Sequence, residues 1–317
     1  MGRALETGLF DPVAADLDRF EARIRESIAI DGPPLAAPMG ELFAAGGKRL
    51  RPALVLLAGR LGRLSESHFH AAAAVELTHA ATLVHDDVID HSSVRRGHPT
   101  IAAVLGDAPA IVVGDYYFAK AYQQAALTAD SAVVGSIAGA VMTICRGELA
   151  QNSARYRYRP SLAEYRERIE AKTAALLAAS AWIGGRLAGL GKEGQEALRL
   201  YGTQLGLAFQ IADDVLDYTA GEAELGKPVG HDLLEGHATL PLLLAELSDE
   251  LPDGIPLPAA RVAEVVAAVR ASGGPERALA EARRHAESAR RHLAGLPEGS
   301  ARESLERLTN YVVERKL

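Results

Sequence analysis

Long segments rich in alanine and leucine constrain the fold of this 317-residue chain more than any other feature of its sequence. Their apolar residues recur with the period of an α-helix, and runs of alternating β-branched residues, which would indicate strands, are few. Hydrophobic residues make up 48% of the chain, enough to bury a sizeable core, while aromatic residues make up only 5%. The sequence therefore predicts an all-α fold, and we expect residues 1–317 to form a single domain.

The charge balance excludes a general nucleic-acid-binding protein, because the formal net charge is −7 and such binding rests on a surplus of Lys and Arg. The basic segment RYRYRP at 155–160 is interpreted as a solvated loop between helices. The single cysteine, Cys145, rules out an internal disulfide and fits a reducing compartment. No signal-peptide segment is visible, and the longest uncharged apolar stretch, 131–145, is shorter than the roughly 20 residues that span a bilayer. We expect a soluble, cytoplasmic protein with no transmembrane segment and no nucleic-acid partner.

The sequence HDDVID at 85–90 recurs as ADDVLD at 212–217, and each copy ends an apolar helical run. Successive helical residues are rotated by about 100°, so the first and last aspartates of each DDxxD motif lie on one face, about 40° apart. Like charges at this spacing destabilise a helix, and burying them costs more still unless a metal or a cation compensates. Mg²⁺ prefers a few carboxylate oxygens and takes its other ligands from water and phosphate. We therefore infer that two facing DDxxD helices clamp a diphosphate through several Mg²⁺ ions; the alternative is two acidic helix ends that face solvent.

Cationic residues accompany the aspartates. The segment GGKRLRP at 46–52 joins two glycines to Lys48, Arg49 and Arg51, and Arg95 and Arg96 follow the first motif closely. Either group alone would be interpreted as a surface charge cluster. Together with two DDxxD motifs they indicate two phosphate subsites.

The chain resembles the trans-isoprenyl diphosphate synthases (polyprenyl synthetases), whose motifs occur in it in the family's order over nearly its whole length. These motifs are GGKRLRP (46–52), HDDVIDHSSVRRGHPT (85–100), VGDYYFAKA (113–121), GEL.Q (147–151), KTA (172–174), FQIADDVLD (209–217) and GKPVGHDLLEGHATLP (226–241). The resemblance implies the isoprenoid synthase fold, a single large helical bundle around a central cavity, assembled as a homodimer.

The resemblance also implies roles for individual residues. Mg²⁺ would be bound by Asp86, Asp90 and Asp213, with Asp217 as a further metal residue and with Asp87 and Asp214 in support. The diphosphate of isopentenyl diphosphate would be held by Lys48, Arg51, His79 and Arg96. The allylic diphosphate would meet Arg95, Lys172, Thr173, Gln210 and Lys227, with Lys172 and Lys227 also acting in catalysis. One position departs from the family, because His237 stands where many members carry Lys, so its contact with the allylic diphosphate stays open.

The implied reaction is a Mg²⁺-dependent head-to-tail (1'-4) condensation of isopentenyl diphosphate with an allylic diphosphate. Metal and cations stabilise negative charge on the departing pyrophosphate, the isopentenyl double bond attacks the developing allylic cation, and a proton is lost. No protein nucleophile is needed, and the released pyrophosphate can accept the proton. This is consistent with the absence of a Ser/His/Asp or Cys/His constellation from the sequence.

Product length is predicted from residues upstream of the first motif on the same helix. In the family, a bulky aromatic residue four or five positions before the first aspartate stops elongation early. Here those positions hold Thr82 and Ala81, with Thr78 and Val75 further down, and none is aromatic. We therefore predict an all-trans product of hexaprenyl to decaprenyl length, as for a quinone side chain. The alternative is a floor formed elsewhere, by Met142 or Phe118, which would make a geranylgeranyl or farnesyl diphosphate synthase.

Three other functions are considered. A terpene cyclase would have an Asn/Ser/Glu pattern as its second metal site, unlike DDVLD. A His/Asp phosphohydrolase would need His79 and His85 on one helical face, but six residues place them about 240° apart. A regulatory subunit without catalytic activity is expected to have lost aspartates, and all six are present.

Overall fold

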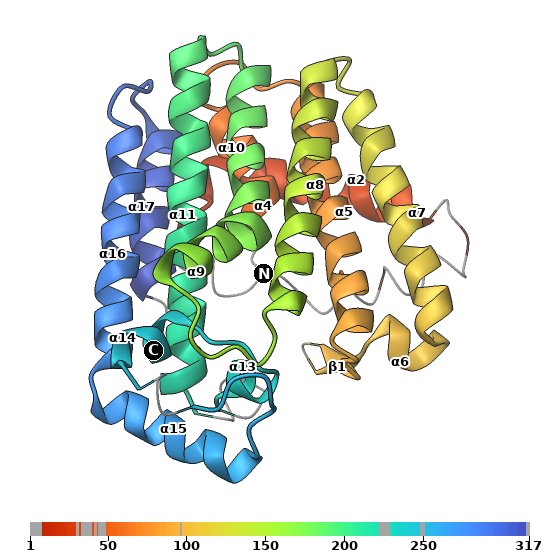
Figure 1. The fold of residues 1–317 in the computed structure, drawn as a ribbon. Coiled ribbons are helices and arrows are strands. Elements are labelled where there is room, and N and C mark those ends of the chain that lie inside the picture. The colour runs from red at the N-terminus through yellow and green to blue at the C-terminus, as the bar shows by residue number, and fades with distance from the viewer. Residues whose placement is uncertain are drawn as a thin grey trace. The chain divides into compact units, whose positions relative to one another are not determined.

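The structure is a computed structural model and describes residues 8–29, 32, 40, 43, 49–95, 97–221, 229–247 and 251–314. Nearly all of its elements are helices, which confirms the all-α prediction (Figure 1). The chain divides into two compact units: unit 1 comprises residues 1–141, 179–199 and 295–305, and unit 2 comprises residues 142–178, 200–294 and 306–317. Four helices contribute residues to both units, and the single domain expected from the sequence stays a prediction.

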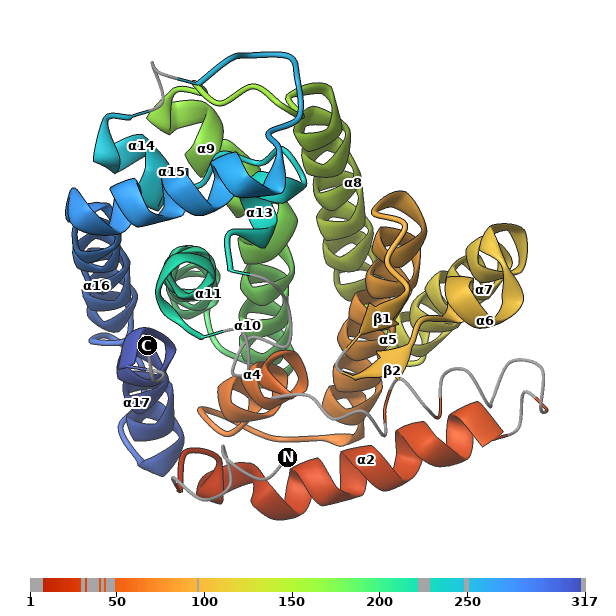
Figure 2. The same ribbon diagram turned by 90° about the horizontal axis from the view of Figure 1, so that it is seen from below.

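Unit 1 is built around one long helix, α5. Its elements are η1 (Asp11–Val13), α2 (Ala14–Ala29), α4 (Leu50–Gly59), α5 (Glu66–Ile89), the hairpin of β1 (Val94–Arg95) and β2 (His98–Pro99), α6 (Ile101–Leu105) and α7 (Asp107–Ala126). Parts of α8 (Ser131–Ser153), α10 (Ala175–Leu187), α11 (Lys192–Thr219) and α17 (Ser300–Glu314) complete it. Helices α4 and α7 both lie beside α5 (Figure 2).

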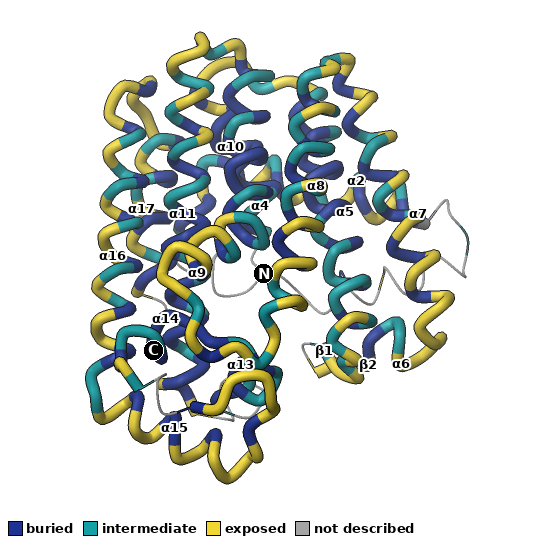
Figure 3. Tube along the Cα trace, in the orientation of Figure 1, coloured by how far each residue is buried: buried dark blue, intermediate teal, exposed yellow. Residues whose placement is uncertain are grey.

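Helix α5 is rich in alanine, a strong helix former, and most of its length is buried (Figure 3). Its first turn is joined to α10 by His68, whose side chain is fully buried. His68 Nδ1 accepts a hydrogen bond from the Ser65 backbone N at 3.0 Å, so Nε2 carries the proton and donates to the Gly184 carbonyl at 3.2 Å. Burial lowers the pKa of His68, which keeps the ring in this neutral form.

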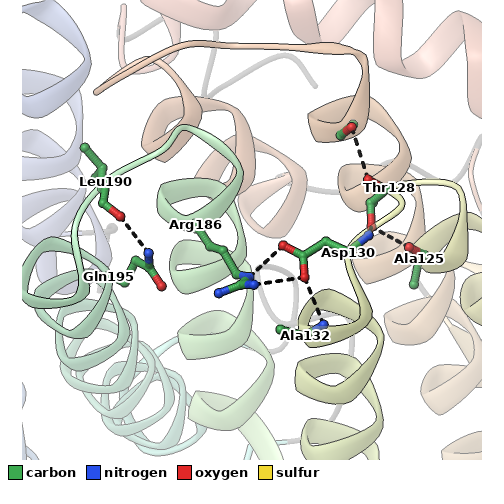
Figure 4. A network of polar contacts seen from close by, with 8 residues as sticks. Ala125, Thr128, Asp130, Ala132, Arg186, Leu190 and Gln195 are labelled. Atoms are coloured by element: carbon green, nitrogen blue, oxygen red, sulfur yellow. Dashed lines mark hydrogen bonds and ion pairs between the residues drawn. The ribbon is translucent and has the colours of Figure 1, made fainter.

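The turn between α7 and α8 is held by a polar network around Asp130 (Figure 4). Asp130 caps α8 by accepting a hydrogen bond from the Ala132 backbone N at 3.0 Å. Its carboxylate also receives two bonds from Arg186 of α10, at 2.7 and 3.0 Å. The Asp130 side chain therefore caps the start of α8 and also links this region to α10.

Replacing Asp130 with Ala is expected to lower the thermal unfolding midpoint by a few degrees, corresponding to about 1–2 kcal/mol for the lost cap and ion pair. The hydrogen bonds from Arg186 lower the pKa of Asp130. Stability from a group with a lowered folded-state pKa is present above its unfolded pKa of about 3.9 and is lost as the pH falls through the folded value. The difference between wild type and Asp130→Ala should therefore be full at pH 7 and shrink below about pH 4.

The control for this prediction is Asp130→Asn, which can still cap α8 but cannot form the ion pair. Its unfolding midpoint at pH 7 should lie between those of the wild type and Asp130→Ala. Equal midpoints for Asp130→Ala and the wild type at pH 7 would contradict the role of this network.

Unit 2 contains the remaining parts of α8, α10, α11 and α17. Its own elements are α9 (Leu162–Ile169), the π-helical turn η2 (Glu170–Ala174), α13 (His231–Leu234), α14 (Leu240–Ala245), α15 (Ala259–Ala271) and α16 (Gly274–His292). Helix α16 contacts both α14 and α15. Tyr218, near the C-terminal end of α11, belongs to a buried cluster that also includes Leu233 of α13 and Val266 of α15. The end of α11 is therefore supported by residues far along the chain.

The basic segment 155–160 is a loop, as predicted, but one of its side chains, Tyr158, is fully buried. Its arginines are engaged within unit 2. Arg155 donates to the Glu235 carbonyl at 2.8 Å, Arg157 pairs with Glu164, and Arg159 lies 3.5 Å from Asp253. These contacts are typical of a structural loop.

Among the described residues, one helix, α8, is long and apolar enough to cross a membrane by length and composition. It runs beyond the apolar stretch noted in the sequence, through Arg146 and Glu148, to Ser153. A single such helix is weak evidence for a membrane protein, because core helices of other proteins meet the same test.

Candidate active site

The first DDxxD motif forms the last turn of α5 in unit 1. Asp87 is buried, and Asp86 and Asp90 are half-buried. The helix ends in a Schellman motif, in which His91 takes a left-handed conformation and the Ser92 backbone N donates to the Asp87 carbonyl at 2.9 Å. The C-terminus of a helix carries partial negative charge, so three carboxylates there repel both the helix end and one another. This end of α5 is suited to binding a cation.

Arg95, at the end of β1, forms an ion pair with the second aspartate of this motif. Its Nε and Nη2 atoms lie 2.8 and 2.7 Å from Asp87 Oδ1. Burial raises the pKa of Asp87, and the Arg95 guanidinium opposes that shift. The structure thus brings Arg95, expected at the allylic diphosphate, directly to the aspartate motif.

The start of α4 places the GGKRLRP arginines in different roles. Arg51 lies in the first turn of α4 and is half-buried. Arg49, grouped above with the phosphate-binding cations, is half-buried and takes a left-handed conformation. Its guanidinium lies 2.7 Å from Glu76 and 3.3 Å from Glu21, and it donates to the Phe43 carbonyl at 3.1 Å. Three acceptors hold Arg49 against α5 and α2, and its grouping with the phosphate-binding cations stays a prediction.

The residues expected to control product length differ in their exposure. Val75, Thr78 and Ala81 are fully buried. Thr82 is half-buried, as is His79, so these two lie on the partly accessible face of α5 that continues to Asp86. The Thr82 hydroxyl donates to the His79 carbonyl at 2.8 Å. Of the four length-controlling candidates, Thr82 is the one with a partly accessible side chain.

The VGDYYFAKA motif is explained by close packing of α7 on α5 beside the first aspartates. His85 Nε2 lies 3.1 Å from the Ile111 carbonyl and 3.6 Å from Asp115. A Cβ atom at Gly114 would lie 2.2 Å from His85 Nε2, so any larger residue here would force the His85 ring to move. The sequence alone did not connect the glycine of this motif with the histidine that precedes the aspartates.

The second DDxxD motif occupies the last two turns of α11 in unit 2. Asp213 is half-buried, whereas Asp214 and Asp217 are buried. Asp217 Oδ2 accepts a hydrogen bond from the Asp232 backbone N at 3.1 Å. Burial and the nearby Asp232 carboxylate raise the pKa of Asp214. Asp232 is therefore a further acidic residue beside the second aspartate motif, and its position in GKPVGHDLLEGHATLP is the signal that could have found it.

The KTA motif lies in the π-helical turn η2. Lys172 Nζ is 2.8 Å from Glu148 Oε2, which connects the KTA and GEL.Q motifs. The Thr173 hydroxyl donates to Gln210 Oε1 at 2.6 Å, and Gln210 Nε2 donates to Asp214 Oδ1 at 2.9 Å. Lys172, Thr173 and Gln210, expected at one substrate, thus lie beside the second aspartate motif in unit 2.

His237 lies near the same cluster. Burial, together with the positive charge of Arg168, lowers the pKa of His237 to about 4. The imidazole is therefore neutral at pH 7, and this position does not supply the fixed positive charge of the lysine that it replaces.

Lys48, Arg96 and Lys227, which the resemblance assigns to the diphosphates, lie outside the described residues. Within the described part of the chain, no three His, Cys, Asp or Glu side chains converge so that they alone could hold a metal ion. Each DDxxD helix end offers a few carboxylate oxygens, which suits Mg²⁺ because this ion takes its remaining ligands from water and phosphate. The donor set therefore fits Mg²⁺ that binds together with a diphosphate.

Comparison with known proteins identifies the family of the chain. The family model "Polyprenyl synthetase" matches residues 33–252. Heptaprenyl diphosphate synthase component 2 of Geobacillus stearothermophilus is 38% identical over 97% of this chain and 98% of that protein. The crystal structure of a decaprenyl diphosphate synthase from Rhodobacter capsulatus has a TM-score of 0.90 and is 36% identical, covering 97% of this chain and 98% of that one. A polyprenyl synthase from Caulobacter crescentus, complexed with calcium and isoprenyl diphosphate, also has a TM-score of 0.90 at 36% identity, covering 98% and 97% of the two chains.

The family model covers most of the chain, and these relatives match it over nearly its whole length. The chain therefore belongs to the polyprenyl synthetase family and is a prenyltransferase.

Proposed function

We propose that this protein catalyses the Mg²⁺-dependent 1'-4 condensation of isopentenyl diphosphate with an allylic diphosphate. It repeats the step to give an all-trans polyprenyl diphosphate of hexaprenyl to decaprenyl length. The observation that carries the proposal is the placement of two DDxxD motifs, each at the C-terminal end of a largely buried helix and each with a cation or hydrogen-bond donors around it. The heptaprenyl and decaprenyl products in the names of two relatives support the length.

The ions are proposed to be held by Asp86, Asp90, Asp213 and Asp217. Mg²⁺ bound there supplies positive charge that offsets the charge building on the departing pyrophosphate. The calcium and isoprenyl diphosphate named in the Caulobacter crescentus complex support a divalent cation bound with a diphosphate.

The chain's own cations orient the two substrates. Arg51 and His79 bind the diphosphate of isopentenyl diphosphate and leave its double bond free to attack. Arg95 and Lys172 bind the allylic diphosphate, and each is already aligned by a carboxylate, Asp87 for Arg95 and Glu148 for Lys172. The proton released after attack goes to the departing pyrophosphate, so no side chain has to act as the base.

The test is the product of the purified protein with farnesyl diphosphate, excess labelled isopentenyl diphosphate and Mg²⁺. The products are dephosphorylated and sized by mass spectrometry, with a chelator as control. We expect a ladder that the chelator abolishes and that ends at six to ten isoprene units. A single product at geranylgeranyl length would contradict the long-chain proposal but keep the chemistry, and no condensation at all would contradict both.

We further propose that the working form is a cytoplasmic homodimer. The name of the Geobacillus stearothermophilus relative calls that protein component 2 of its synthase, which makes a second subunit the competing hypothesis. Light scattering of the purified chain should give twice its mass of 33.5 kDa, and this species alone should produce the ladder. A monomer that is active only after a second protein is added would contradict the homodimer.

A further inference from the structure

Tyr165 is a buried residue that none of the roles assigned above uses. It lies on α9, and its side chain is only 3% exposed. Its hydroxyl donates a hydrogen bond to Asp214 Oδ2 at 2.6 Å. Burial and the adjacent Asp214 carboxylate raise the pKa of Tyr165 well above its usual value, so the hydroxyl stays a donor.

The other oxygen of the same carboxylate is also held. Gln210 Nε2 donates to Asp214 Oδ1 at 2.9 Å, and Gln210 Oε1 accepts from the Thr173 hydroxyl at 2.6 Å. The chain of hydrogen bonds therefore runs from η2 through α11 to α9. Both oxygens of the buried Asp214 carboxylate therefore accept hydrogen bonds from neutral donors, Tyr165 and Gln210.

The backbones of these elements also approach unusually closely. A Cβ atom at Gly206 would lie 2.5 Å from Ala174 Cα, and one at Gly202 would lie 2.6 Å from Ala178 Cα. The two glycines and Gln210 follow one another at intervals of four residues on one side of α11. They bring the π-helical turn η2 against α11 at the point where the Thr173 hydroxyl reaches Gln210. Such π-turns are frequent at functional sites.

Asp214 lies on the same helix end as two residues proposed to bind the metal. Asp213 directly precedes it and Asp217 follows three residues later, so any rotation or fraying of the end of α11 would turn all three carboxylates together. Hydrogen bonds to both oxygens of Asp214 therefore hold the end of α11 in one orientation. Without the Tyr165 hydroxyl, one oxygen of a buried carboxylate would lose its donor, and the helix end would have to shift to find another.

We propose that Tyr165 is a positioning residue of the prenyl transfer reaction. It holds Asp214 and thereby aims Asp213 and Asp217 at the metal and diphosphate. The inference rests on the proposed function but assigns to Tyr165 a role separate from substrate contact.

The test is Tyr165→Phe, which removes the hydroxyl and keeps the ring. We expect kcat to fall by about 10- to 100-fold, as for other residues that orient metal ligands, with the KM for isopentenyl diphosphate unchanged within about twofold. The half-saturating Mg²⁺ concentration should rise by about tenfold. A readout independent of turnover is the increase in unfolding midpoint when Mg²⁺ and inorganic pyrophosphate are added, which should be smaller in the variant than in the wild type.

The matched control is Tyr158→Phe, another fully buried tyrosine of unit 2, whose hydroxyl donates to the Ile255 carbonyl at 3.4 Å and not to an aspartate. This control should keep the wild-type kcat, Mg²⁺ requirement and pyrophosphate-induced midpoint shift. The proposal is overturned if Tyr165→Phe also keeps all three. It is equally overturned if Tyr165→Phe only lowers the unfolding midpoint without ligands while its Mg²⁺ requirement stays that of the wild type. Failure of the wild-type protein to condense the substrates would count against the proposed function instead.

Discussion

Replacing Asp213 with Ala is expected to lower kcat/KM for condensation by at least about 10³-fold, because it removes a carboxylate proposed to bind the metal where negative charge builds in the transition state. Asp86→Ala should have an effect of the same size for the same reason. Both aspartates are half-buried at the end of a helix, so truncation should leave the packing of α5 and α11 nearly unchanged. The measurement is steady-state turnover across a Mg²⁺ titration, with circular dichroism to confirm folding.

The control for both variants is Asp18→Ala, which removes an exposed aspartate of α2 remote in sequence from either motif. Its turnover should match that of the wild type. If Asp213→Ala or Asp86→Ala turns over at the wild-type rate, the motif concerned takes no part in catalysis. Condensation would then not depend on both motifs, which would contradict the proposed mechanism.

Replacing Thr82 with Phe is expected to shorten the product from the hexaprenyl to decaprenyl range to geranylgeranyl length or less. Thr82 is half-buried, one turn before Asp86 on the partly accessible face of α5. A phenyl ring there would block the direction in which a prenyl chain bound at Asp86 must grow. The rate of the first condensation should stay close to that of the wild type, and mass spectrometry of the dephosphorylated products gives the length.

Two variants make this prediction specific. Thr82→Ser keeps a hydroxyl that can donate to the His79 carbonyl and adds no bulk, so its product should match that of the wild type. Ala81→Phe places the same ring at a fully buried position, where overpacking should cost about 1–3 kcal/mol of stability. A product of unchanged length from Thr82→Phe would contradict this prediction and show that the prenyl chain grows along another path.

The sequence alone was sufficient for features set by local spacing. Helical period and composition determined the all-α fold, and the DDxxD spacing determined that the first and last aspartates of each motif share a face. These predictions succeed because the geometry of an α-helix depends only on nearby residues. The resemblance of the motifs also gave the family, which the comparisons confirm.

Only the tertiary structure decided which partners each side chain has and how deeply it is buried. Arg49 and Arg51 are two residues apart, yet one is anchored by Glu76, 27 residues away, and the other lies in the first turn of α4. Asp214 is fixed by Tyr165, 49 residues away in sequence, a partner that no local pattern indicates. Ala81 and Thr82 are adjacent, but only packing makes the first fully buried and the second partly accessible. Hydrogen bonds and burial between distant segments depend on how the helices pack, and the period of a single helix carries no information about its neighbours.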